Sequence, residues 1–140
     1  MVMKELFAVF DTNVLVSALL SRRNDSATVQ LLDHVLDGRI TLLYNDEILD
    51  EYNEVLHRSK FNFENERIQA VIQLVRTGVE LERTSSNEFF QDPDDMVFYE
   101  VALSKDGAFV VTGNSRHFPK SPIVVTPAEM IEIINQQDFS

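Results

Sequence analysis

Short apolar runs alternate with helical patterns along the whole length of this 140-residue chain. Five runs rich in β-branched or aromatic residues predict strands at residues 6–10, 40–44, 79–82, 108–112 and 123–125. Apolar residues spaced three or four apart predict helices at residues 13–22, 27–37, 46–58, 64–77, 94–105 and 127–136. This alternation favours an α/β fold with a parallel sheet. Because the chain has no linker or repeat and the length of an ordinary domain, we expect a single domain over residues 1–140.

Residues at the ends of the predicted helices support these boundaries. The last helix has the clearest start, with a cap at Thr126, proline at the first helical position and Glu129 at the third. Gly38, Gly78 and Gly107 each follow a helical pattern and precede a strand. We expect all three to adopt the left-handed conformation that ends many helices and that costs glycine least.

The composition limits the partners and the location of the protein. The chain has 23 acidic and 12 basic side chains, and its net charge of −11 opposes non-specific binding to nucleic acid or to an anionic membrane surface. The lack of cysteine excludes disulfides and thiolate metal sites and agrees with a reducing cytoplasm. The apolar run at 6–10 is too short for a signal peptide or a membrane span, so we expect a soluble, cytoplasmic protein.

Asp11 lies where the first predicted strand meets the first predicted helix. In a parallel sheet, ligands bind at the carboxyl ends of the strands, so a carboxylate at this position suits a functional site. Aspartate at a helix start also serves as a cap that accepts backbone N–H hydrogen bonds. The choice between these roles depends on the other acidic residues.

In predicted helix 46–58, Glu51 is the acidic residue closest to the buried face. At about 100° per residue, Asp50 points almost opposite the apolar stripe, whereas Glu51 borders it. Glu51 is therefore a candidate ligand, and a solvated glutamate that packs its methylenes on the stripe is the alternative. It lies about 9 Å into the helix at 1.5 Å per residue, so it reaches the strand edge only if the helix leans across that edge.

Three aspartates surround Pro93 at the start of predicted helix 94–105. Proline at the first helical position makes Asp92 the cap and puts Asp95 near it, while Asp94 points elsewhere. One acidic residue is enough to stabilise a helix start, by about 0.3–1 kcal/mol. Crowded carboxylates repel one another by about 4 kcal/mol per pair at 4 Å and an effective dielectric constant of 20. A bound cation would relieve this repulsion.

Asp11, Asp95 and Asn114 all fall at carboxyl ends of predicted strands or at helix starts. Such positions share one edge of a parallel sheet. Clustered oxygen ligands, with no cysteine or histidine among them, suit a hard cation. The sequence therefore favours a site for Mg²⁺ or Mn²⁺ at this edge.

Four motifs occur in the order found in a known family. They are Asp11-Thr12-Asn13-Val14-Leu15-Val16-Ser17-Ala18, Glu51-Tyr52-Asn53-Glu54-Val55-Leu56, Asp92-Pro93-Asp94-Asp95 and Val111-Thr112-Gly113-Asn114-Ser115-Arg116-His117-Phe118. Through these motifs, over nearly its whole length, the chain resembles PIN-domain proteins, and more narrowly the bacterial PIN group of toxins from toxin–antitoxin pairs. The resemblance implies a PIN-like fold, with a five-stranded, mainly parallel sheet and helices on both faces. It also implies a metal-dependent ribonuclease that acts on single-stranded RNA.

The resemblance further implies roles for individual residues. The catalytic carboxylates that hold Mg²⁺ or Mn²⁺ would be Asp11, Glu51 and Asp95, with Asp92 as an accessory acid. The residues that support the site would be Thr12, Asn13, Ser17 and Thr112, with ordinary capping as the alternative. The candidates for contact with RNA phosphate are Arg116 and His117, with a solvated loop as the alternative.

Asn114 departs from the family pattern, which has aspartate after Thr-Gly. Asparagine keeps a carbonyl oxygen, so Asn114 remains a candidate metal ligand, but it supplies no charge and cannot act as a base. A second metal ion would be held less tightly, and Asp92 or Asp94 would have to compensate. The substitution points to reduced or lost activity.

Other classes of protein fit part of the pattern. A non-catalytic PIN domain that binds RNA or a partner protein is favoured by Asn114 and by the acidic charge balance. Phosphotransfer domains also place aspartate at a strand end, but the haloacid-phosphatase type needs a second aspartate where this chain has Asn13, and receivers place theirs mid-chain. Among partners, the resemblance to toxins implies a small antitoxin that covers the acidic site, and it implies a homodimer.

Overall fold

The computed structural model describes residues 5–138 as an α/β fold around one five-stranded sheet. The strands are β1 (Leu6–Phe10), β2 (Ile40–Tyr44), β3 (Val79–Glu80), β4 (Phe109–Val111) and β5 (Val124–Val125). The helices are α1 (Thr12–Leu20), α2 (Ala27–Leu36), α3 (Asp46–Leu56), α4 (Asn65–Arg76), α5 (Pro93–Leu103) and α6 (Pro127–Asp138), with a short 3-10 helix, η1 (Ser115–His117). The strand order is β3-β2-β1-β4-β5, and all four pairings are parallel. The predicted parallel α/β fold is confirmed.

β1 and β2 have their predicted bounds, whereas β3, β4 and β5 are shorter than predicted. β1 and β2 match the apolar runs at 6–10 and 40–44. β3 and β5 lie at the two edges of the sheet, pair on one side only and contain two residues each. The apolar runs therefore overstate the length of three of the five strands, including β4, which pairs on both sides.

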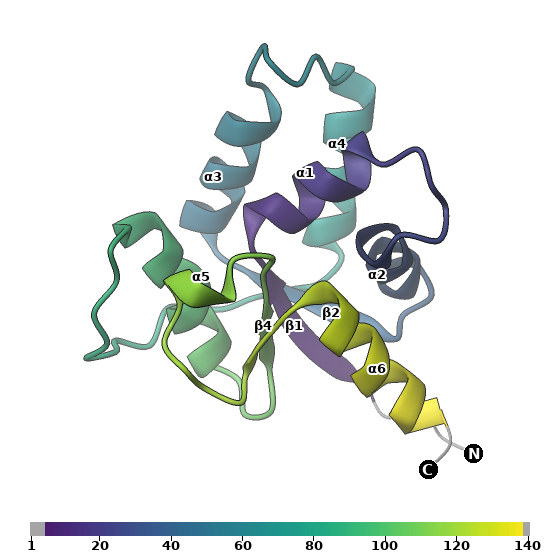
Figure 1. Ribbon diagram of the computed structural model, residues 1–140. Coiled ribbons are helices and arrows are strands. Elements are labelled where there is room, and N and C mark those ends of the chain that lie inside the picture. Colours follow the sequence, from purple (N-terminus) through teal and green to yellow (C-terminus); the bar gives the residue numbers. More distant parts are fainter. Residues whose placement is uncertain (1–4, 139–140) are drawn as a thin grey trace.

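Helices cover both faces of the sheet, as predicted (Figure 1). α5 packs on β1, β2 and β4, while α2 and α6 pack against each other on the opposite side. α3 contacts α1, α4 and α5 beyond the end of β1. The carboxyl end of β1 is thus surrounded by α1, α3 and α5.

Two of the three predicted left-handed glycines have that conformation. Gly38 and Gly107 have φ angles of 80° and 81°, but Gly78 does not have a positive φ. A Cβ atom on Gly78 would lie 1.9 Å from the carbonyl oxygen of Leu42. The prediction for Gly78 was wrong, because this glycine is required by a close approach to β2 and not by backbone conformation.

The predicted start of α6 is confirmed by two reciprocal hydrogen bonds. Thr126 Oγ1 accepts from Glu129 N at 3.2 Å, and Glu129 Oε1 accepts from Thr126 N at 2.8 Å. This arrangement is a capping box. Within residues 5–138, no helix combines the length and the apolar character needed to cross a membrane.

Candidate functional site

Asp11 is a buried carboxylate at the junction of β1 and α1, with 5% of its surface exposed. It occupies the cap position of α1 but makes no side-chain capping hydrogen bond. Its Oδ2 instead accepts a hydrogen bond from Thr112 Oγ1 at 2.7 Å, across from the end of β4. Thr112, which lies outside α1, therefore contributes to the orientation of the Asp11 side chain.

The protonation of Asp11 reflects opposing influences. Burial raises the pKa of its carboxyl above the ordinary value, while the hydrogen bond from Thr112 and the backbone N–H groups of Asn13 and Thr12 lower it in part. The charge of His117 acts in the same lowering direction. Asp11 is thus a desolvated group whose ionised form is only partly stabilised by the protein.

Thr112 connects Asp11 to the segment that contains Asn114. Thr112 is fully buried, and its Oγ1 also accepts from the backbone N–H of Asn114 at 3.0 Å. Asn114 is the cap residue of η1, and its carbonyl accepts from His117 N at 2.9 Å. Its exposed side chain makes no hydrogen bond within the described residues, so Asn114 is linked to Asp11 through its backbone.

Asp95 is half-buried in the first turn of α5 and shares its electrostatic environment with Asp11. Burial, followed by the charges of Asp11 and Asp92, raises the pKa of Asp95 to about 6, against a smaller opposing effect of His117. Neither Asp11 nor Asp95 forms an ion pair with a basic side chain within residues 5–138. The charges of these two carboxylates therefore act on each other, and neither carboxylate has an ion-paired basic side chain in the described part of the chain.

Asp92 caps the N-terminus of α5. It precedes Pro93 at the first position of α5, and its Oδ1 accepts from Asp94 N at 2.9 Å. Asp92 is exposed, and its negative charge raises the pKa of Asp95. Asp92 therefore acts on the site through its charge while its side chain caps the helix.

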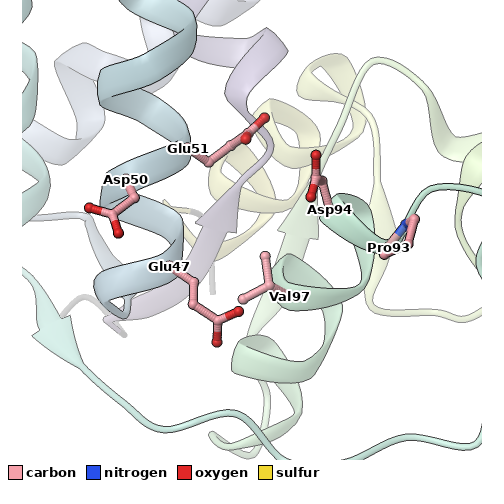
Figure 2. Close-up of a pocket in the computed structure, with 6 residues that line it drawn as sticks. All are labelled: Glu47, Asp50, Glu51, Pro93, Asp94 and Val97. Carbon is pink, nitrogen blue, oxygen red and sulfur yellow. The ribbon is translucent and has the colours of Figure 1, made fainter.

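Glu51 faces α5 across a hollow of about 330 Å³ that is lined by Glu47, Asp50, Glu51, Pro93, Asp94 and Val97 (Figure 2). We call this hollow the acidic cleft. Burial and then the charge of Asp94 raise the pKa of the half-buried Glu51. α3 does lean across the end of β1, because the hydroxyl of Tyr52 donates to the carbonyl of Phe10. Asp94 was expected to point away from the other acids, but it shares this cleft with Glu51.

The structure thus groups the acidic residues as two neighbouring pairs, Asp11 with Asp95 and Glu51 with Asp94. Within residues 5–138, no three histidine or acidic side chains are close enough to hold one metal ion. The donor set does fit a hard cation, since every candidate ligand is an oxygen. Burial first, and then repulsion by Asp11 and Asp92, raises the pKa of Asp95, and a bound divalent cation would offset both effects.

The three predicted supporting residues on α1 reach Asp11 in different ways or not at all. Thr12 and Asn13 act on it through their backbone N–H groups. The buried Oγ1 of Thr12 has no hydrogen-bond partner in the described part of the chain. Ser17 Oγ lies 3.3 Å from Thr28 Oγ1 on α2 and makes no hydrogen bond with Asp11 in the described residues, so the hydroxyl that donates to Asp11 is that of Thr112.

The two predicted RNA contacts lie on different sides of η1. His117 is exposed, and its charge acts on both Asp11 and Asp95, so the structure brings it to the acidic site. Arg116 is also exposed but lines a separate hollow of about 500 Å³ together with Phe118 and Lys120. Of the two, only His117 acts through its charge on Asp11 and Asp95.

Two features of the site region were missed from the sequence. Tyr52 has no role of its own in the sequence patterns, yet its hydroxyl anchors α3 to the end of β1. Glu100 on α5 is buried and binds Arg83, which follows β3. A signal for Glu100 was present, because it is the only charged residue in the run Met96–Leu103.

Comparison with known proteins supports the family resemblance. A sequence model described as PIN domain matches residues 8–116, which span the chain from β1 into η1. No curated protein and no solved structure matches the chain. Proteins of the matching family have a nuclease-like fold and generally use divalent metal ions. Since the match covers well over half of the residues, this chain belongs to the PIN-domain family.

Proposed function

We propose that this protein is a metal-dependent endoribonuclease that hydrolyses phosphodiester bonds of single-stranded RNA. The observation that carries the proposal is the buried Asp11, held by Thr112 beside Asp95, with no basic ion-pair partner for either carboxylate in the described residues. Burying carboxylates without counter-ions costs stability, so a functional need for them is the simplest explanation.

In this proposal, Asp11 and Asp95 hold Mg²⁺ or Mn²⁺, and Glu51, Asp94 and Asn114 are the nearby oxygen groups that complete its surroundings. When bound, the cation would lower the pKa of a water molecule and stabilise the charge that develops on the phosphate. Thr112 keeps the Asp11 carboxylate in one orientation by donating to Oδ2. His117, which is exposed beside both aspartates, contacts a phosphate oxygen of the RNA.

A cleavage assay tests the proposal. Single-stranded RNA is incubated with the protein and Mn²⁺ or Mg²⁺, and wild type is compared with Asp11→Asn. We expect cleavage by the wild type, loss of cleavage in Asp11→Asn, and unchanged cleavage in the control Asp25→Asn, whose carboxylate pairs with Arg23 on the surface. Equal cleavage by Asp11→Asn and wild type would show that the assigned site is wrong.

Asn114 supports a second candidate function, that of a non-catalytic domain that binds RNA or a protein. Its amide carries no charge and cannot serve as a base. Calorimetry with Mn²⁺ separates the two functions, because a binding module without metal affinity gives no heat of binding. If asparagine only weakens a working site, Asn114→Asp increases both Mn²⁺ affinity and cleavage.

As a cellular role we propose a cytoplasmic toxin of a toxin–antitoxin pair, with a small antitoxin as partner. The acidic cleft suits a basic segment of such a protein, since four of its six lining residues are carboxylates. Co-purification from the native host tests for the partner, and sedimentation tests for the proposed homodimer. A monomer that captures no partner would contradict this role without affecting the cleavage assay.

A further inference from the structure

The acidic cleft lies between two helices that have few contacts with each other. α3 contributes Glu47, Asp50 and Glu51, and α5 contributes Asp94. The rings of Tyr52 on α3 and Phe98 on α5 stack with their centroids 6.2 Å apart. Because four carboxylates line the cleft and no basic residue does, their repulsion favours separation of the two helices.

Arg83 connects the two helices at the end of the cleft. Its Nη1 donates to Glu47 Oε2 on α3 at 2.8 Å. Its Nε donates to Glu100 Oε1 on α5 at 2.9 Å, and its Nη2 lies 2.7 Å from the same oxygen. Arg83 thus bonds carboxylates from both acidic helices, although it belongs to the segment that follows β3.

The α5 side of this bridge is rigidly held. The Glu100 side chain is only 7% exposed, and its second oxygen accepts from Ser86 N at 2.7 Å. The Glu100 carbonyl accepts from Thr84 N at 3.0 Å. Both carboxylate oxygens are therefore occupied, and the backbone that directly follows Arg83 is hydrogen-bonded to Glu100.

The bridge is close enough to the proposed ligands to affect their spacing. Glu47 is one helical turn before Glu51, which is about 6 Å along the axis, and Glu100 is about 9 Å along α5 from Asp94. A change in the separation of the helices at Arg83 therefore changes the distance between Glu51 and Asp94.

We infer that Arg83 is a positioning residue that sets the separation of α3 and α5 and thereby the affinity of the acidic site for a divalent cation. The part of this inference that concerns cation affinity rests on the proposed metal-dependent function, whereas the part that concerns helix separation does not. A purely electrostatic argument predicts that removing the positive charge of Arg83 tightens the binding of Mn²⁺ to the acidic site. A positioning role predicts the opposite, that Mn²⁺ binding becomes weaker.

The test compares Arg83→Met, Arg83→Lys and wild type by Mn²⁺ titration followed by electron paramagnetic resonance. We expect Mn²⁺ affinity to fall about tenfold in Arg83→Met, as for other groups that support metal ligands. Lysine keeps the charge but lacks the planar fork that binds two carboxylates, so Arg83→Lys also weakens binding, and it carries the test if the methionine variant does not fold. The control Arg23→Met removes an ion-paired arginine whose partner, Asp25, lies in the same loop, and it leaves the affinity unchanged.

A second readout needs no metal. The chain has no cysteine, so nitroxide labels attach only to Glu54→Cys on α3 and Leu103→Cys on α5. We expect the distance distribution between the labels to broaden or lengthen in Arg83→Met. An unchanged distribution overturns the inference, as does Mn²⁺ affinity that stays equal or increases in both Arg83 variants. If the distribution changes while the wild type binds no Mn²⁺, the positioning role stands and the proposed metal-dependent function fails.

Discussion

Asp95 and Glu100 lie on the same helix, and both are shielded from water, but the protein treats their charges differently. Glu100 binds Arg83 through one oxygen and the backbone N–H of Ser86 through the other. Asp95 has no basic ion-pair partner in the described chain, and its neighbours Asp11 and Asp92 raise its pKa to about 6. A carboxylate whose hydrogen bonds and charge are satisfied stabilises the fold, whereas one left uncompensated indicates a binding function.

The largest expected effect is on catalysis and concerns the uncompensated acid. Asp95→Asn preserves the shape of the side chain but removes its charge, so we expect divalent-dependent RNA cleavage to fall to background while the circular dichroism spectrum is unchanged. Glu88→Gln, in the exposed loop before α5, is the control and cleaves at the wild-type rate. If Asp95→Asn retains full activity, the uncompensated charge of Asp95 does not serve catalysis.

Thr112→Val tests whether the orientation of Asp11 matters as well as its charge. The change removes the hydroxyl that donates to Asp11 Oδ2 but keeps the volume of the side chain. We expect Mn²⁺ affinity and cleavage to fall about 10- to 100-fold, which is the usual effect of removing a group that hydrogen-bonds to a metal ligand. Thr77→Val, on the surface after α4, is a matched control. Wild-type affinity in Thr112→Val would mean that the hydrogen bond serves stability alone.

Glu100→Ala tests whether the fully bonded carboxylate of Glu100 stabilises the fold. It leaves the guanidinium of Arg83 with only Glu47 as a partner and leaves the N–H of Ser86 unpaired. We expect the free energy of unfolding to fall by about 2 kcal/mol, below the range for fully buried pairs because Arg83 is partly exposed. Urea denaturation measures this loss. Glu54→Ala removes an exposed carboxylate paired with Arg58 and is expected to cost under about 0.5 kcal/mol. Similar costs for the two variants would contradict a structural role for Glu100.

The smallest expected effect is the pH dependence of stability in the metal-free protein. The folded-state pKa of Asp95, about 6, exceeds its ordinary value of 3.8, so the folded protein binds this proton more tightly than the unfolded chain. The resulting destabilisation is complete above pH 6 and disappears as the pH falls toward 4. Asp95→Asn should therefore stabilise the protein by about 1 kcal/mol at pH 7.5, after allowance for the partial exposure of the group, and by almost nothing at pH 4. Urea denaturation in the presence of EDTA measures both values. An equal increase in the free energy of unfolding at both pH values would mean that the effect of Asp95→Asn does not come from ionisation of Asp95.

The sequence predicts the parts of this structure that depend on local pattern. β1 and β2 are continuous apolar runs because they lie in the middle of the sheet, and Pro93 fixes the register of α5. The placement of Asp11 at the carboxyl edge follows from that pattern. The approach of Asp94 to Glu51 does not, because it depends on how two separate helices pack. Arg83 was not predictable either, since its partners are determined by the path of the chain after β3.

The hydrogen bond between Thr112 and Asp11 joins residues that are 101 positions apart in the chain. Contacts of such long range form late, because most of the chain must be ordered before the two groups meet. A nascent or truncated polypeptide that ends within α5 holds Asp11 and Asp95 but not the hydroxyl that orients Asp11. Incomplete products of synthesis therefore contain the acidic residues without the finished site, and the proposed activity would require translation to have passed β4.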